Sequence, residues 1–299
     1  VVKLWRIFNL SVKLAHRIHM KVEVRRCQKS DLTGFLMILT KTGVILILDK
    51  NGNYISSIRK DGTVFTSISV VQDLLFLGTS NGTIQIYNAS SLLFKSEIPY
   101  QHQIKSKMLL GPDAIRLGGV IKGPPTHDVR LSSDGTVMVI VHSDSSMLVY
   151  GSKKKSVINY NIGHGMKINK LKWSPYDHKM FATCSNDQSI SLWSQNGDRW
   201  SLKQIDVTRS IDSSLANYRT QSLDHQKGSR SQKFVLTCLE FHPGKPFLVC
   251  GCNKGTIRMF SLHSGELISQ SESSNGKVVG MSFAGNGLYL AVCYSNGVC

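Results

Sequence analysis

Four side chains near the middle of the chain, those of His164, Thr183, Asp187 and Trp193, can pass hydrogen bonds from one to the next. An imidazole can bridge a carboxylate and a hydroxyl, and that hydroxyl can accept the N–H of an indole. Because buried polar atoms need partners, we predict a relay in which His164 joins Asp187 to Thr183, and Thr183 meets Trp193. The alternative is that the four residues are unrelated. In such a relay each polar group has a partner inside an apolar wedge.

The segment that carries these residues alternates between apolar runs and polar turns. Residues 163–193 read GHGMKINKLKWSPYDHKMFATCSNDQSISLW. An apolar strand follows Gly163-His164, a Ser-Pro turn leads to a second strand, and a polar turn precedes a third strand that ends at Trp193. This order resembles one repeat of a WD40 β-propeller almost position for position. The resemblance implies a platform that binds partners.

The same unit recurs along the chain. Turns of the kind seen at Asp187 occur at five other places: Thr42, Asn81, Asp144, Lys254 and Asn296. The spacings are 39, 63, 43, 67 and 42 residues, against about 40–45 for a four-stranded blade, so two units carry insertions of about twenty residues. The runs VILIL, TIQIY, MLVY, SISLW and TIRMF alternate as strands do. We predict an all-β, WD40-type β-propeller with about six four-stranded blades.

The blades are predicted to follow a short N-terminal stretch and to carry two loop insertions. Residues 1–17 are interpreted as the end of a preceding blade and a linker, because VVKLW aligns with a third strand. Residues 18–299 are predicted to hold the blades, with insertions at about 100–128 and 206–233. The second insertion is Ser-rich, so we expect it to be disordered and the first to be partly ordered. Since the chain starts and stops inside blades, we expect a longer, seven-bladed or double-propeller protein.

The formal net charge of +17 is concentrated in a few places. Candidate docking residues are the following: Lys153, Lys154, Lys155, Arg25 and Arg26. We expect the three lysines to lie in a loop that leads to the first strand of the next blade at Val157-Ile158. A basic excess favours acidic partners, such as RNA, tubulin or acidic protein segments. The alternative is a basic surface that only aids solubility. An aromatic-interleaved RNA motif is absent, which disfavours RNA.

Motifs for catalysis or metal binding are missing from the sequence. It contains no nucleophile elbow, phosphate loop, zinc-protease helix or paired zinc ligands. Five cysteines, Cys184, Cys238, Cys250, Cys252 and Cys293, fall in predicted buried strands and are interpreted as small core residues in a reducing compartment. We therefore predict no enzymatic activity, cofactor, metal or small-molecule substrate. Apolar runs are too short to span a bilayer, so no membrane partner is expected.

One stretch resembles a particular group of WD40 proteins. Residues 73–104, DLLFLGTSNGTIQIYNASSLLFKSEIPYQHQI, are similar to the second propeller of the mitogen-activated-protein-kinase-binding and spindle-pole WD-repeat scaffold family. TKTGVILILDKNG precedes it and CSNDQSISLW follows it in a similar order, whereas residues 105–135 depart from the pattern. The resemblance implies a non-catalytic scaffold for kinase-cascade components or microtubule-organising structures. The kinase-docking segments of that family lie outside its propellers, so no binding residue is carried over.

Three functional hypotheses follow from these features. The first is a protein-binding scaffold of a cytoskeletal (microtubule, centrosome or cilium) or kinase-signalling assembly, located in the cytoplasm at the centrosome, spindle or cilium. The second is a propeller subunit of a ribonucleoprotein or ribosome-assembly complex in the nucleus or nucleolus, which would use the basic surface. The third is a peptide-reading module, for example for a modified tail or a degradation signal.

Overall fold

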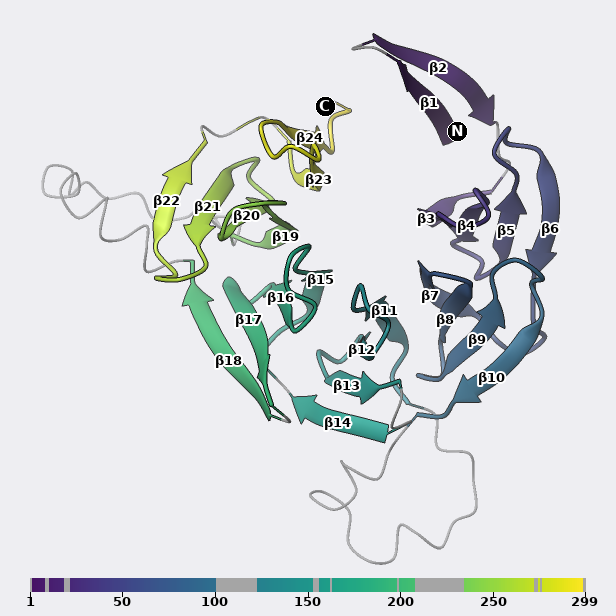
Figure 1. Ribbon diagram of the computed structural model, residues 1–299, viewed down its shortest axis with the longest axis horizontal. Coiled ribbons are helices and arrows are strands. Elements are labelled where there is room, and N and C mark those ends of the chain that lie inside the picture. Colours follow the sequence, from purple (N-terminus) through teal and green to yellow (C-terminus); the bar gives the residue numbers. More distant parts are fainter. Residues whose placement is uncertain are drawn as a thin grey trace, which may run out of the picture. The chain divides into compact units, whose positions relative to one another are not determined.

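The computed structural model describes residues 2–8, 11–18, 22–100, 123–152, 156–161, 163–197, 199–207, 234–271, 274 and 276–297. Within these ranges the regular structure consists of 24 β-strands, and neighbouring strands pair in chain order (Figure 1). No helix in the described part of the chain is long and apolar enough to cross a membrane. The all-β prediction is confirmed.

Five sheets have four antiparallel strands each. Their strands are β3 (Val24–Lys29), β4 (Leu36–Thr40), β5 (Ile45–Leu48) and β6 (Tyr54–Ile58); β7 (Phe65–Val71), β8 (Leu74–Thr79), β9 (Ile84–Asn88) and β10 (Phe94–Ile98); β11 (Thr126–Leu131), β12 (Val137–His142), β13 (Met147–Gly151) and β14 (Ser156–Asn161); β15 (Ile168–Trp173), β16 (Met180–Ser185), β17 (Ser189–Asn196) and β18 (Arg199–Asp206); and β19 (Leu236–Phe241), β20 (Phe247–Cys252), β21 (Ile257–Ser261) and β22 (Leu267–Gln270).

Two further sheets in the described ranges have only two strands. β1 (Val2–Phe8) pairs with β2 (Ser11–Ile18), and β23 (Val278–Phe283) pairs with β24 (Leu290–Tyr294). Residues 11–18, which were expected to lie largely in a linker, form strand β2. The insertion expected at about 100–128 ends earlier than predicted, since β11 begins at Thr126. Most of it, and most of the insertion at 206–233, lies outside the described residues.

Contacts divide the chain into two compact units, and each has its own core. One unit comprises residues 1–131 and 139–143, and its core lies between the sheets β3–β6 and β7–β10, around Phe65, Met37 and Leu77. The other comprises 132–138 and 144–299, and its core lies between β15–β18 and β19–β22, around Phe260, Leu239 and Ala182. In both, the buried side chains come from adjacent sheets, so each sheet buries its apolar face only with a neighbour.

A side chain near the start of a sheet's first strand repeatedly bonds the first residue of the next sheet. Thr66 Oγ1 donates to Thr126 O at 2.7 Å, Asn169 Nδ2 donates to Leu236 O at 2.6 Å, and Thr237 Oγ1 donates to Val278 O. Thr66, Asn169 and Thr237 are each the second residue of that strand. These bonds set the spacing of neighbouring sheets at the edge where the first strands begin.

The turn between the second and third strands has one backbone conformation throughout. Its residue with positive φ is Gly43, Gly82, Ser145, Gln188 or Gly255, and Gly297 occupies the same place after β24, with φ between 71° and 84° in all six. Glycine adopts this left-handed conformation without a Cβ penalty, whereas Ser145 and Gln188 carry that penalty. Both of these follow an aspartate, Asp144 or Asp187, which accepts hydrogen bonds from the residue two positions later.

Candidate functional site

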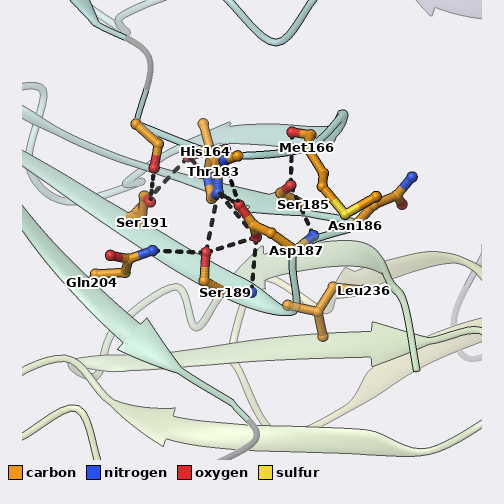
Figure 2. Close-up of polar contacts among 12 residues, drawn as sticks. His164, Met166, Thr183, Ser185, Asn186, Asp187, Ser189, Ser191, Gln204 and Leu236 are labelled. Carbon is orange, nitrogen blue, oxygen red and sulfur yellow. Dashed lines mark hydrogen bonds and ion pairs between the residues drawn. The ribbon is translucent and has the colours of Figure 1, made fainter. Parts of the chain in front are cut away.

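The four predicted relay residues come together around one imidazole. His164 precedes β15, Thr183 lies on β16, Asp187 lies in the β16–β17 turn and Trp193 lies on β17. His164 Nδ1 lies 3.0 Å from Asp187 Oδ2, and its Nε2 lies 2.8 Å from Thr183 Oγ1 (Figure 2). Trp193 Nε1 donates to Thr183 Oγ1 at 3.2 Å. The chain of bonds runs in the predicted order.

Two further residues join the relay that the sequence interpretation missed. Ser189 Oγ donates to Asp187 Oδ1 at 2.8 Å and lies 3.2 Å from His164 Nδ1, and Gly165 N donates to Asp187 Oδ2 at 3.0 Å. Figure 2 shows Ser189 and Asp187 converging on the ring of His164. The signal was available for Ser189, because a residue two positions after an aspartate is the usual partner in an Asx turn.

Burial determines the charge state of the site. The His164 side chain is fully buried, and burial lowers its pKa, although the nearby Asp187 carboxylate opposes this shift. Burial by itself would raise the pKa of Asp187, but hydrogen bonds from Ser189 and His164 outweigh it, and the pKa of Asp187 is lowered. We therefore assign a neutral His164 that donates from Nδ1 to Asp187 and accepts at Nε2 from Thr183.

Access decides what this arrangement can do chemically. A hydroxyl, an imidazole and a carboxylate in that order would have the connectivity of a hydrolase triad. Thr183 is 0% exposed, however, and its oxygen already accepts the indole N–H of Trp193. No substrate atom can reach a hydroxyl that is sealed and occupied in this way. The geometry therefore supports a structural role for the relay.

Aromatic packing seals the inner end of the relay. The Trp193 ring stacks on Phe181 with centroids 5.7 Å apart, and Phe181 also contacts Trp173 and Trp200. Gly163 lies against the same indole: a Cβ at this position would come within 2.5 Å of Trp193. The Gly that precedes the His in this repeat is thus required by close approach, and any larger residue would displace the indole.

The other sheets lack the full set and replace it in two ways. Hydroxyl pairs occupy the end of the second strand in two of them, Thr40 with Thr42 and Thr79 with Thr83, each at 2.9 Å. In β21 the position of Trp193 is taken by Phe260, which is fully buried in the apolar core. Apolar packing therefore takes over where the relay is missing.

The predicted basic docking residues fall into three groups. Lys153, Lys154 and Lys155 lie outside the described residues. The expectation that they lead into a new blade is wrong, because Ser156–Asn161 pairs with β13 as the fourth strand of the same sheet. Arg25 is exposed. Arg26 instead forms an ion pair with Asp128, whose side chain is only 3% exposed, so it neutralises a buried carboxylate.

The cysteines show no cluster suited to metal binding. In the part of the chain that the structure describes, no group of three or more His, Cys, Asp or Glu residues could hold a metal ion. Cys184, Cys238, Cys250 and Cys252 are buried, and burial raises the pKa of Cys250 to about 12. Cys293 is only half-buried, in contrast to its predicted core position.

Family models identify two parts of the chain. Residues 153–194, which contain the whole relay, match the WD domain, G-beta repeat. Residues 203–286 match the WD40 domain of anaphase-promoting complex subunit 4. The chain carries WD40 repeats. WD40 propellers bind other proteins and are typically non-catalytic.

Sequence relatives and solved structures extend this similarity. Mouse mitogen-activated protein kinase-binding protein 1 is 23% identical over 91% of this chain and 20% of its own length. Pre-mRNA-processing factor 19 of Oryza sativa subsp. japonica is 23% identical over 62% of this chain and 41% of its own length. The chain thus spans about a fifth to two fifths of these relatives.

Two solved structures show the fold. A chain in the crystal structure of the mitotic checkpoint complex superimposes with a TM-score of 0.71 at 13% identity, over 99% of this chain and 82% of its own. The Cps50 (Swd1) β-propeller domain of Myceliophteria thermophila gives 0.54 at 13% identity, over 79% and 65%. The predicted WD40 β-propeller fold is confirmed.

Proposed function

We propose that this propeller is a non-catalytic scaffold that binds other proteins within a kinase-signalling or cytoskeletal (microtubule, centrosome or cilium) assembly. The supporting observation is the similarity to mouse mitogen-activated protein kinase-binding protein 1, which extends over 91% of this chain. The sealed Thr183 hydroxyl supports the absence of catalysis. The corresponding location is the cytoplasm, at kinase complexes or at the centrosome, spindle or cilium.

Two direct binding measurements test this proposal. The purified chain is immobilised and exposed to purified mitogen-activated protein kinases, and separately it is co-sedimented with microtubules that have intact or proteolytically removed acidic tails. We expect saturable binding to a kinase, or co-sedimentation that depends on the tails. The Asp187→Ala variant, unfolded by mild urea, controls for adhesion of a denatured chain. Failure of both measurements with the folded chain would refute a scaffold of these assemblies.

A ribonucleoprotein role is the second candidate. The net charge of +17 and the similarity to the rice pre-mRNA-processing factor 19 favour it. Changing Lys153, Lys154 and Lys155 together to Glu replaces three positive charges with three negative ones. RNA or microtubule binding should then weaken at low salt and differ less at high salt, because exposed charges are screened over about 8–10 Å. An unchanged affinity and salt slope would mean that these lysines form only a solvated loop.

A further inference from the structure

A pocket of about 600 Å³ opens at one end of the strands of the sheet β3–β6. It lies between the β4–β5 turn and the segment that connects β6 to β7. Its lining combines cations, hydroxyls, one carboxylate and two branched apolar side chains: Thr42, Val44, Arg59, Lys60, Asp61, Thr63 and Val64, with Gly43 and Gly62. The volume is in the usual range for a ligand site, and charged side chains stand beside apolar ones in the lining.

The walls of this pocket are held in place by backbone contacts. Phe65 N donates to Gly43 O at 3.3 Å, and Thr63 N donates to Lys60 O at 3.1 Å. A Cβ on Gly43 would come within 2.4 Å of Val64, so the turn and the connecting segment touch directly. A pocket with walls fixed in this way loses little conformational entropy when a ligand binds.

Arg59 is the unpaired cation of the pocket. Its side chain is exposed, and within the described ranges it has no ion-pair partner, whereas Lys60 lies 3.5 Å from Glu97. A planar guanidinium presents paired donors that match a carboxylate.

We propose that this pocket binds an extended peptide segment in which a carboxylate side chain lies next to an apolar one. Arg59 binds the carboxylate, the hydroxyl of Thr63 bonds the peptide backbone, and Val64, which is 44% exposed, contacts the apolar side chain. Asp61 also lines the pocket, so its charge repels the carboxylate and weakens this binding. The inference rests on the proposed function, because it supplies a partner class for a protein-binding scaffold.

Fluorescence anisotropy with three labelled eight-residue peptides tests the site. One peptide alternates Glu and Val, and the other two carry Gln or Lys in place of Glu. We expect the Glu peptide to bind the whole chain most tightly and Arg59→Gln to weaken it by about tenfold, the effect of losing one charge-assisted hydrogen bond. Asp61→Asn should strengthen it. The matched control is Lys50→Gln. Lys50 is exposed and follows β5 at the opposite end of the strands of the same sheet, so this change should leave peptide binding unaltered.

Other outcomes overturn the pocket proposal, and the last of them overturns the proposed function instead. Tighter binding of the Lys peptide, with the two variant effects reversed in sign, would show a site for basic segments. Equal losses in Arg59→Gln and Lys50→Gln would show general electrostatic attraction, and equal binding of the Gln peptide would show that the carboxylate is irrelevant. If the chain binds a kinase or microtubules but Arg59→Gln leaves binding of the Glu peptide unchanged, the pocket proposal alone is refuted. Peptide binding by a chain that binds neither partner would refute the scaffold and leave the pocket.

Discussion

The substitution Asp187→Ala tests the relay most directly. The carboxylate accepts hydrogen bonds from four donors: His164 Nδ1, Gly165 N, Ser189 N and Ser189 Oγ. The first donor belongs to a fully buried side chain, and leaving such a donor unpaired costs about 1–3 kcal/mol. The other three lie at a turn where the carboxylate is 18% exposed, so water can replace part of what they lose.

We therefore expect the free energy of unfolding to fall by about 2–4 kcal/mol, a large fraction of the 5–15 kcal/mol typical of a domain. Urea titration followed by tryptophan fluorescence measures it, because Trp193 and its aromatic neighbours lie beside the relay. The matched control is Asp49→Ala: Asp49 accepts three bonds from Asn51 and Asn53 at an exposed turn, so its loss should matter far less. If Asp187→Ala unfolds at the same urea concentration as the parent, the buried imidazole does not depend on this carboxylate.

Three further predictions follow from the same structure. Because burial lowers the pKa of His164, the folded chain takes up its proton less readily than the unfolded chain; stability should be highest above the usual value of about 6.5 and should fall as the pH drops below it. Urea midpoints that stay constant from neutral to mildly acidic pH would contradict this. Phe260→Ala should cost about 3–5 kcal/mol in chemical denaturation, since the ring is fully buried in an apolar core; a loss below 1 kcal/mol would mean that the core re-packs. Gln188→Gly should raise the free energy of unfolding by about 1 kcal/mol, because φ is 71° there and four equivalent turns use glycine. Gly82→Ala should lower the free energy of unfolding, as measured by urea titration. If both variants change it in the same direction, the turn relaxes around a side chain and the argument from φ is wrong.

Local sequence patterns were enough to predict the relay, the strands named below and the turns between second and third strands. His164, Asp187, Thr183 and Trp193 lie within a single repeat, so their contacts follow from the geometry of one three-stranded meander. The same is true of the alternating runs that form β5, β9, β13, β17 and β21. In each case the interacting residues are near one another in sequence, and the hydrophobic period of two determines which side chains share a face.

Contacts between sheets could not be predicted from local sequence patterns. Arg26 and Asp128 are 102 residues apart, and no local feature distinguishes the paired Arg26 from the exposed Arg25. The run at Val157-Ile158 was predicted to be the first strand of a new blade. In the structure it belongs to β14, the fourth strand of the same sheet as β13.

The sequence by itself determined the repeat, the alternating third strand of each blade and the residues of the buried relay, because these depend on neighbours within about 30 residues of chain. Only the tertiary structure decided which sheet a strand joins, which cations are neutralised and where Arg59 meets the walls of a pocket. Those outcomes depend on how sheets pack, and packing brings together side chains that the sequence keeps far apart.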